Sequence, residues 1–258
     1  MDYQEVLVSA TDAIVSITLN SPKTANALSK NMIAELISIF KSLHENSSIK
    51  VIIIKAAGKH FCSGHNLKEM IDGHVTEYKF IFKQCAEMMA LIHEIPQIVI
   101  AQVHGVATAA GCQLAAQCDL GVASESARFG TPGVKIGLFC TTPMVAVSRA
   151  VGRKHAMEML LTGRLITAHE AQIYGLINQI VPDPELENAT YNLAEIIAKS
   201  SSLTLAIGKK AFYSQIDMPE NKAYDHAVEV MTFNLMTEDA QNGIKAFLAK
   251  KPPIWRGR

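Results

Sequence analysis

The stretch from Val99 to Val122, VIAQVHGVATAAGCQLAAQCDLGV, limits the possible folds more than any other part of this chain of 258 residues. Its apolar, β-branched beginning is typical of a buried strand, and the pattern stops at His104-Gly105. Small residues follow from Ala107 to Gly111, before the helix-forming run from Leu114 to Gln117. The stretch therefore predicts a strand, a tight loop and the start of a helix, in that order.

A loop of small residues at the start of a helix has two interpretations. The first N–H groups of a helix have no partner inside it, and a ligand oxygen can reach them when no bulky side chain intervenes. Such N–H groups suit an oxyanion that develops during a reaction. Small residues also allow a helix to pack closely, and this stretch alone does not decide between the two interpretations.

Composition and charge limit the classes of partner and the compartment. With 24 basic and 24 acidic residues the formal net charge is zero, so nothing indicates a nucleic acid or an anionic membrane as a partner. The five cysteines are odd in number and lack CxxC spacing, which argues against a disulfide framework or a metal site and favours a reducing compartment. The sequence shows no targeting pattern and no run long enough for a membrane span. We therefore predict a cytoplasmic protein, although a chain trimmed of a transit peptide would look the same.

The hydrophobic patterns predict an α/β architecture. Alternating residues at Tyr3 to Val8 and Ala13 to Leu19 indicate an antiparallel hairpin, and Ser29 is expected to cap a helix. The apolar run from Val51 to Ile54 is typical of a strand covered on both faces. Another glycine-bearing loop, from Ala57 to Leu67, precedes another helix. Repeated strands with crossover helices predict sheets that are covered by helices.

The end of the chain has a different pattern. Helices are expected near 143–150, 153–161, 185–199, 201–215, 219–235 and 238–249, and no strand pattern recurs from about Glu185 onward. We therefore predict a core of residues 1–197 followed by a helical segment of residues 198–258. An apolar stripe at Val228, Met231 and Leu235 indicates either assembly with other copies or closure of the chain's own core.

Two loops carry a resemblance to a known family. The sequence from Phe61 to Met70, FCSGHNLKEM, is similar to the pattern F-x-[AS]-G-x-D-[IL]-K-E-[LM], and Val103 to Leu114 is similar to N-G-x-A-x-G-G-G-x-E-L. Both patterns are signatures of the enoyl-CoA hydratase/isomerase (crotonase) superfamily. Further matches follow in the right order at Asn26-Ala27-Leu28, Cys118-Asp119-Leu120, Phe129-Gly130-Thr131-Pro132, Ala150-Val151-Gly152, Leu161-Thr162-Gly163 and Ala171 to Leu176. The resemblance covers nearly the whole chain.

The resemblance implies both a fold and an activity. It implies a crotonase-like α/β spiral of repeated ββα units, with a helical C-terminal segment used to assemble homotrimers or homohexamers. It also implies a lyase or isomerase of fatty acid metabolism that acts on acyl-CoA thioesters. Coenzyme A would be part of the substrate, so no separate cofactor, nucleic acid or membrane partner is expected.

The resemblance also implies site residues. Family members hold the thioester carbonyl in an oxyanion hole of two backbone N–H groups, which correspond here to Ser63 and Ala110. Substrate contacts are implied for Lys23, Thr24, Ala25, His65, Asn66, Leu67 and Gly111, with the adenine end near residues 23–25 and 65–67. The acyl-CoA is thus expected between the two signature loops.

The acid–base groups depart from the family pattern. Family hydratases use two glutamates, and Gln113 and Gly133 stand at those positions, while Asn66 replaces the usual aspartate. Loss of general acid–base assistance typically lowers a rate by about 10²–10⁴-fold per group. We therefore expect weak or absent hydratase activity, partly restored by Gln113→Glu with Gly133→Glu. The alternative is a catalytically silent acyl-CoA-binding or assembly protein with the same fold.

Other residues are conceivable replacements for the missing groups. His65 and Glu69 are candidate bases, and Cys112 and Cys140 are candidate nucleophiles. A structural role is the preferred interpretation for each of them, and also for His104 beside the second loop. Asp119 follows the predicted helix, and its position indicates a turn residue.

Overall fold

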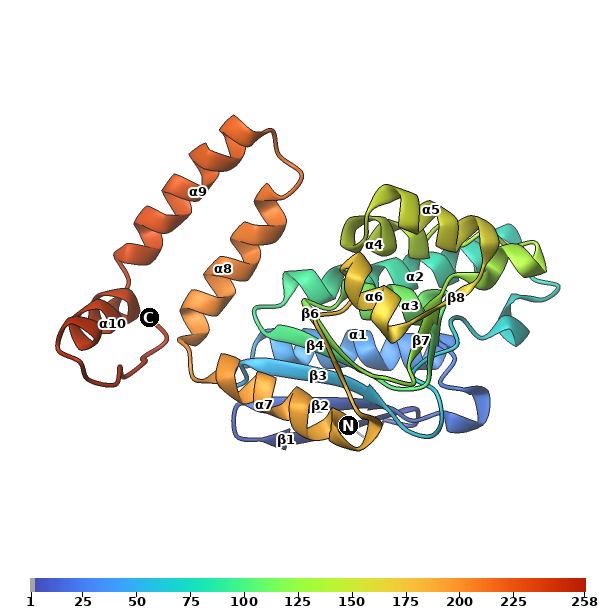
Figure 1. The fold of residues 1–258 in the computed structure, drawn as a ribbon, viewed down its shortest axis with the longest axis horizontal. Coiled ribbons are helices and arrows are strands. Elements are labelled where there is room, and N and C mark those ends of the chain that lie inside the picture. Colours follow the sequence, from blue (N-terminus) through green and yellow to red (C-terminus); the bar gives the residue numbers. More distant parts are fainter. Residues whose placement is uncertain (1–2) are drawn as a thin grey trace.

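The computed structural model describes residues 3–258, so residues 1–2 of the predicted core lie outside the described part (Figure 1). Its main sheet has the strand order β1-β2-β3-β4-β6-β9. These strands are β1 (Val6–Thr11), β2 (Ile14–Leu19), β3 (Val51–Ala56), β4 (Ile98–Val103), β6 (Leu120–Ser124) and β9 (Gln179–Val181). Strands β1 and β2 pair antiparallel, which confirms the predicted hairpin, and the other neighbours pair parallel.

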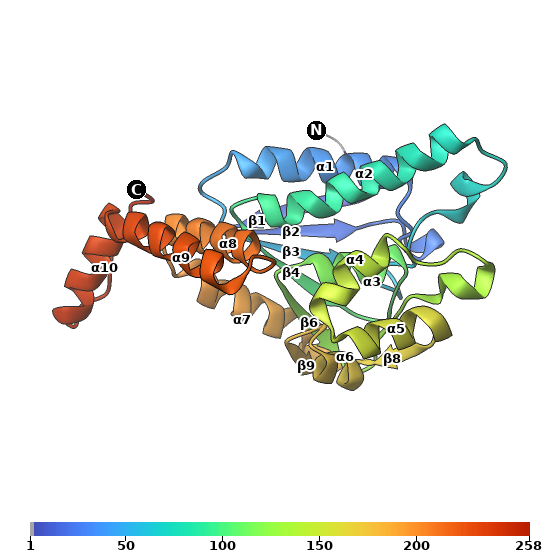
Figure 2. The ribbon, with the colours of Figure 1, turned by 90° about the horizontal axis from the view of Figure 1, so that it is seen from above.

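Helices cover both faces of the main sheet. Figure 2 shows α1 (Lys30–His44) and α2 (Val75–Glu94) on one face and α7 (Leu186–Ala198) on the other. In β3, Ile52 and Ile54 belong to the core under α1 and α2, whereas Val51 and Ile53 pack with residues of α7. The prediction of a strand buried on both faces is therefore confirmed.

The start of α1 shows how a local sequence pattern determines where a helix begins. The hydroxyl of Ser29 accepts a hydrogen bond from the Met32 N–H at 2.9 Å, as expected of a helix cap. The apolar positions Met32, Leu36 and Phe40 recur at helical spacing and are fully buried against the sheet. Capping and periodicity thus agree on this helix.

A smaller sheet stands beside the main one and supports the site. It contains β5 (Val106–Thr108), β7 (Arg128–Gly130) and β8 (Leu165–Thr167), in that order. The remaining helices of the body are α3 (Ala110–Gln117), α4 (Pro143–Ala150), α5 (Arg153–Thr162) and α6 (Ala168–Tyr174). Within residues 3–258, four short 3-10 helices complete the body: η1 (Pro22–Thr24), η2 (Leu67–Met70), η3 (Pro132–Ile136) and η4 (Asp183–Glu185).

Residues 199–258 form a C-terminal arm that extends away from the body (Figure 1). The arm contains α8 (Ser202–Gln215), α9 (Glu220–Leu235) and α10 (Glu238–Leu248), which confirms the predicted helices. None of the helices in the described residues is long and apolar enough to cross a membrane.

One buried ion pair attaches α8 to the body. The Lys209 ammonium lies 2.7 Å from Asp119 Oδ2, and it also donates to the carbonyls of Ile92 at 2.6 Å and Gln97 at 2.7 Å. The Lys209 side chain is 3% exposed and that of Asp119 is 10% exposed. Asp119 lies in the bend between α3 and β6, as predicted, and its carboxylate also anchors the arm, a role that the sequence analysis missed.

Candidate active site

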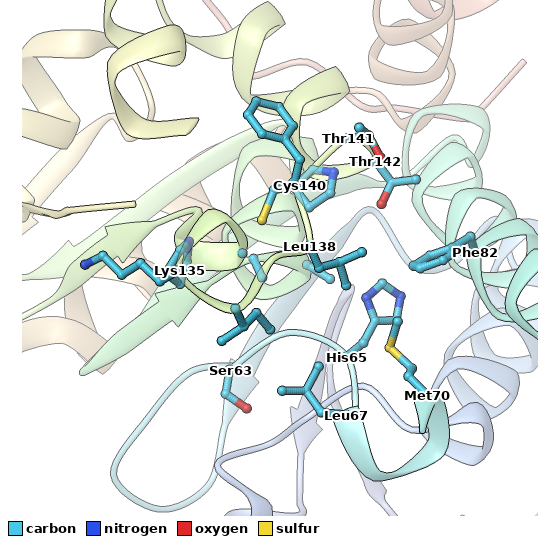
Figure 3. A pocket seen from close by; sticks show the side chains of 17 residues that line it. Ser63, His65, Leu67, Met70, Phe82, Lys135, Leu138, Cys140, Thr141 and Thr142 are labelled. Atoms are coloured by element: carbon cyan, nitrogen blue, oxygen red, sulfur yellow. The ribbon is translucent and has the colours of Figure 1, made fainter. Parts of the chain in front are cut away.

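The two signature loops meet beside a cavity of about 380 Å³ (Figure 3). The first loop and η2 form one wall, α2 closes the far side, and the chain between β7 and α4 forms the opposite wall. The lining is mainly apolar and comprises Ser63, His65, Leu67, Met70, Phe82, Ala109, Ala110, Pro132, Gly133, Lys135, Ile136, Leu138, Phe139, Cys140, Thr141, Thr142 and Pro143.

Two glycines allow the signature loops to touch. A β-carbon added at Gly64 would lie 2.8 Å from the Ala109 β-carbon, and one added at Gly111 would lie 2.1 Å from the Cys62 carbonyl oxygen. The Thr108 N–H donates to that same carbonyl at 2.9 Å. Gly111 lies outside the cavity lining and serves the packing of the two loops, so the structure gives it no direct contact with a ligand in this cavity.

The assignment of the Ser63 N–H as an oxyanion donor is wrong. This N–H donates to the carbonyl of Ala25 at 3.0 Å, and the Ser63 hydroxyl donates to the carbonyl of Thr24 at 3.3 Å. Both donors of Ser63 therefore hold the first loop to η1. The direction of a backbone N–H depends on the local chain path, which the motif alone does not specify.

His65 and Ala110 present N–H groups that are available to a ligand. His65 forms a parallel bridge with Leu28, in which Leu28 donates to Gly64 at 2.7 Å and Asn66 donates to Leu28 at 3.1 Å. The bridge leaves the His65 N–H directed away from Leu28 and without a partner among the described residues. Ala110 is the first residue of α3, so its N–H has no acceptor inside the helix. The two N–H groups lie on facing loops of one cavity.

The two positions of the family glutamates have different surroundings. Gln113 is 5% exposed and lies outside the cavity lining, and its Oε1 has no hydrogen-bond partner in the described part of the chain. Gly133 lines the cavity, but a β-carbon there would lie 2.1 Å from the Leu138 carbonyl oxygen and 2.7 Å from Cys140 Sγ. The Gly133→Glu substitution expected to restore hydratase activity therefore does not fit this loop.

The cavity wall holds no carboxylate among the lining residues that the structure describes. Burial lowers the pKa of His65 to about 4, so its ring is neutral at pH 7, and its Nε2 has no partner in the residues described. The ring meets Phe82 edge-on, with 5.5 Å between the ring centroids. Burial also raises the pKa of the Cys140 thiol, which keeps that thiol protonated.

Glu69 and Asn66 shape the first loop without lining the cavity. Glu69 Oε2 accepts a hydrogen bond from the Lys30 N–H at 2.9 Å, at the start of α1. Asn66 accepts from the Lys68 N–H at 3.2 Å and donates to Glu69 Oε1 at 3.4 Å. The structural interpretation of Glu69 is thus supported, and Asn66, predicted as a substrate contact, acts as a cap in this loop.

His104 and Cys112 also have structural surroundings. The His104 ring is hydrogen-bonded to the carbonyl of Gly58 at 2.9 Å, and Cys112 is fully buried, which raises the pKa of its thiol to about 12. Neither residue lines the cavity. Cys140 does line it, with its thiol beside Gly133.

The segment from Lys23 to Ala25 packs against the first loop, where Ala25 accepts the hydrogen bond from the Ser63 N–H. The next residue, Asn26, holds this segment in place, because it is fully buried and donates to the carbonyls of Ala57 and His60 at 2.8 Å each. Lys23, Thr24 and Ala25 lie outside the cavity lining, so their contact with an adenine group stays a prediction. His65 and Leu67 are the predicted substrate contacts that the structure brings into the cavity.

The sequence analysis missed the far wall of the cavity. Met70 and Phe82 lie near His65 on that side, and Leu138 reaches in from the opposite loop (Figure 3). Phe82 is one of many apolar residues in α2, so no sequence signal distinguishes it from a core residue. Only the packing of α2 beside the first loop identifies its role.

Comparison with known proteins agrees with the fold. The sequence profile of the family described as Enoyl-CoA hydratase/isomerase matches residues 9–258. The chain therefore belongs to the enoyl-CoA hydratase/isomerase family of the crotonase superfamily, and it has the crotonase fold.

Relatives and solved structures match over most of their length. "Enoyl-CoA hydratase domain-containing protein 3, mitochondrial" of Mus musculus is 46% identical over 245 residues, which are 95% of this chain and 82% of the relative. An enoyl-CoA hydratase structure from Mycobacterium smegmatis has a TM-score of 0.96 at 42% identity, covering 98% of this chain and 99% of that one. The human enoyl Coenzyme A hydratase domain-containing protein 3 has a TM-score of 0.95 at 43% identity, covering 98% and 100%.

The same relatives contradict the cytoplasmic prediction. The Mus musculus protein and its counterparts from Xenopus laevis and Homo sapiens are all named mitochondrial. The cytoplasmic prediction rested on cysteine usage and on the lack of a targeting pattern, and neither distinguishes the cytoplasm from another reducing compartment. That prediction is wrong by this comparison.

Proposed function

We propose that this chain binds acyl-CoA thioesters with the acyl group in the cavity and the thioester carbonyl between the N–H groups of His65 and Ala110. The observation that carries the proposal is the pair of unpartnered N–H groups on two loops that Gly64 and Gly111 hold together. Fixed donors of this kind stabilise developing negative charge, typically by about 3–4 kcal/mol for each donor. The family acts on acyl-CoA thioesters, which supports this class of substrate.

The reaction that we propose passes through an enolate but does not use two glutamates. Gln113 does not titrate, Gly133 has no side chain, and the described cavity lining contains no carboxylate. Without both acid–base groups, hydration of crotonyl-CoA is expected to be slower by about 10⁴-fold, or roughly 5 kcal/mol of barrier. We therefore expect carbonyl polarisation with weak or absent hydration.

The second candidate is a silent acyl-CoA-binding protein with this fold. The absence of a carboxylate from the described cavity lining also supports this candidate, because an enolate forms only if some group removes a proton from the α-carbon. The two candidates agree on binding and differ on proton transfer. Separate measurements of the two steps distinguish them.

Carbonyl polarisation is tested by isotope-edited infrared spectroscopy of butyryl-CoA labelled with ¹³C at the carbonyl. We expect the carbonyl band to move to lower frequency on binding, and Ala110→Pro to abolish most of that shift because proline lacks the N–H group. Proline is tolerated at the first position of a helix, and circular dichroism checks the fold. The control Ala110→Gly keeps the N–H group and should keep the shift. An unshifted band in the bound natural protein would contradict the proposal.

Proton transfer is tested by incubating the protein with butyryl-CoA in D₂O and measuring deuterium at the α-carbon by mass spectrometry. Exchange above the protein-free rate supports the enzyme, whereas tight binding without exchange supports the silent protein. Rapid hydration of crotonyl-CoA, near the common enzyme value of about 10 s⁻¹, would contradict both candidates.

A further inference from the structure

The polar side chains in the cavity are few, and one of them, His65, carries a buried polar atom without a partner. His65 Nε2 is buried and has no hydrogen-bond partner in the described part of the chain. A buried polar atom without a partner typically lowers stability by about 1–3 kcal/mol, so its presence in a native protein needs an explanation such as a functional role or a bound molecule. The imidazole ring contacts Phe82 edge-on, with 5.5 Å between the ring centroids.

The wall opposite His65 carries two hydroxyl groups. Thr141 and Thr142 line the cavity across from the imidazole ring in Figure 3, at the start of α4. Neither hydroxyl has a hydrogen-bond partner among the residues that the structure describes, and Thr142 makes no side-chain cap to α4. The cavity therefore offers hydrogen-bonding groups from two sides and apolar contacts elsewhere.

We infer that His65, Thr141 and Thr142 together bind a neutral hydroxyl or oxo group carried by the acyl chain of the substrate. This inference rests on the proposed function, because it assumes that the acyl chain occupies the cavity. The neutral imidazole has one donor nitrogen and one acceptor nitrogen, and a hydroxyl group can pair with either because it can both donate and accept a hydrogen bond. The substrate class is thus an acyl-CoA with a functionalised chain, not a plain alkyl chain.

The position of the polar group follows from the two roles of His65. The main-chain N–H of His65 holds the thioester carbonyl, whereas its ring extends from that point toward Phe82 at the far wall (Figure 3). The group that meets the ring therefore lies beyond the carbons next to the thioester. We assign it to the fourth or a later carbon of the acyl chain.

The charge of the cavity selects a neutral group. Burial keeps the His65 ring neutral, and Lys135 points away from His65 in Figure 3. A carboxylate in an apolar cavity without a paired cation is strongly disfavoured. A terminal carboxylate on the acyl chain is therefore expected to weaken binding.

Calorimetric titration tests the inference with four ligands: hexanoyl-CoA, 4-hydroxyhexanoyl-CoA, 5-hydroxyhexanoyl-CoA and adipyl-CoA. We expect at least one hydroxylated ligand to bind the natural protein about tenfold more tightly than hexanoyl-CoA, and adipyl-CoA to bind less tightly than hexanoyl-CoA. In His65→Phe the ratio between hydroxylated and plain ligand should fall to about one. The ratio is taken within one protein, so a general loss of affinity cancels.

A matched double variant, Thr141→Val with Thr142→Val, tests the opposite wall and should reduce the same ratio at least threefold. An unchanged ratio in His65→Phe, or a preference for adipyl-CoA, would overturn the inference while leaving the proposed function intact. If none of the four ligands binds the natural protein, the proposed function fails as well. A ratio of one in the natural protein means that water occupies the polar groups, which also overturns the inference.

Discussion

Single residues decide which chemistry the cavity can hold, and Gly133 is the clearest case. A β-carbon at this position would meet the Leu138 carbonyl oxygen at 2.1 Å, and backbone cannot move aside as a flexible side chain can. We expect Gly133→Ala to lower the free energy of unfolding by about 1–3 kcal/mol, measured by urea titration. Gly133→Glu should be worse, because a larger side chain must enter the same space.

The control for this prediction is Gly208→Ala in the interior of α8. A β-carbon at Gly208 would meet nothing within 4 Å, and alanine favours a helix over glycine by up to about 1 kcal/mol. This variant should therefore be as stable as the natural protein or more stable. Equal losses at the two glycines would contradict the steric explanation.

His65 predicts a pH dependence of stability. Its pKa is about 4 in the folded chain, whereas an unfolded histidine titrates near 6.5, so only the unfolded state takes up the proton between these values. The contribution of His65 is therefore lost as the pH falls from about 6.5 to 4, by up to roughly 3 kcal/mol. Urea unfolding of the natural protein and of His65→Phe at pH 7 and pH 4.5 should show a difference that changes with pH. Parallel behaviour of the two proteins would exclude this role.

The site residues show what a motif can and cannot predict. The family pattern correctly placed both loops beside one cavity, and Ala110, expected in the loop before the helix, is the first residue of α3 in the structure. It gave the wrong first donor, because the backbone N–H of Ser63 donates to Ala25, whereas that of His65 has no partner among the described residues. The direction of each N–H depends on bridges to Ala25 and Leu28, which lie more than thirty residues away in sequence.

At the scale of elements, the attachment of α8 depends on the pair of Lys209 and Asp119. Lys209→Met would leave the Asp119 carboxylate buried with, among the described residues, only the Tyr213 hydroxyl at 2.8 Å and the Val99 N–H at 2.7 Å as donors. Removing one partner of a buried ion pair typically destabilises a protein by about 3–5 kcal/mol. We expect a loss of this size in urea unfolding.

An exposed ion pair provides the comparison. Lys41 and Glu87 lie 2.7 Å apart, but their side chains are 58% and 49% exposed, so solvent screens their attraction. Lys41→Met should change the free energy of unfolding by less than about 1 kcal/mol. If the two lysine variants lose the same stability, burial of the Lys209 pair does not matter.

Elements with a strong period were predictable, and short ones were not. The Ser29 cap and the apolar face of α1 predict that helix from its local sequence, and the arm helices are likewise predictable from their local sequence. Strands β8 and β9 have three residues each, which is too short for an alternating pattern to appear. Their existence depends on pairing with β7 and β6, a property of the assembled sheets.

At the scale of the whole molecule, the C-terminal arm carries apolar side chains that the chain itself leaves uncovered. Val228, Met231, Leu235, Met236, Phe247 and Leu248 are each more than half exposed. The alternative that this stripe closes the chain's own core is therefore wrong. Apolar surface of this extent indicates a protein interface, so we expect a trimer or a hexamer, a state that stays a prediction here.

Light scattering after size exclusion tests the assembly. The natural protein should elute at three or six times the monomer mass, and Phe247→Lys with Met231→Lys should lower that mass. The control is Ile173→Lys on α6, because Ile173 is 81% exposed, like Phe247, but lies outside the arm. A single peak of monomer mass for the natural protein would refute the prediction.

The contact between Gly133 and Leu138 also bears on how this chain can evolve. A change from glycine to glutamate requires one or two altered bases in the gene, and its product would have to displace the main chain at Leu138, in the same loop, before it could take part in any reaction. The first mutant on that route would lose stability without gaining a function, and selection would remove it. The loop from Val134 to Leu138 would need to open by earlier, neutral changes. This packing therefore makes the gain of two-glutamate chemistry a less accessible evolutionary step for this protein than a change in the acyl group that it binds.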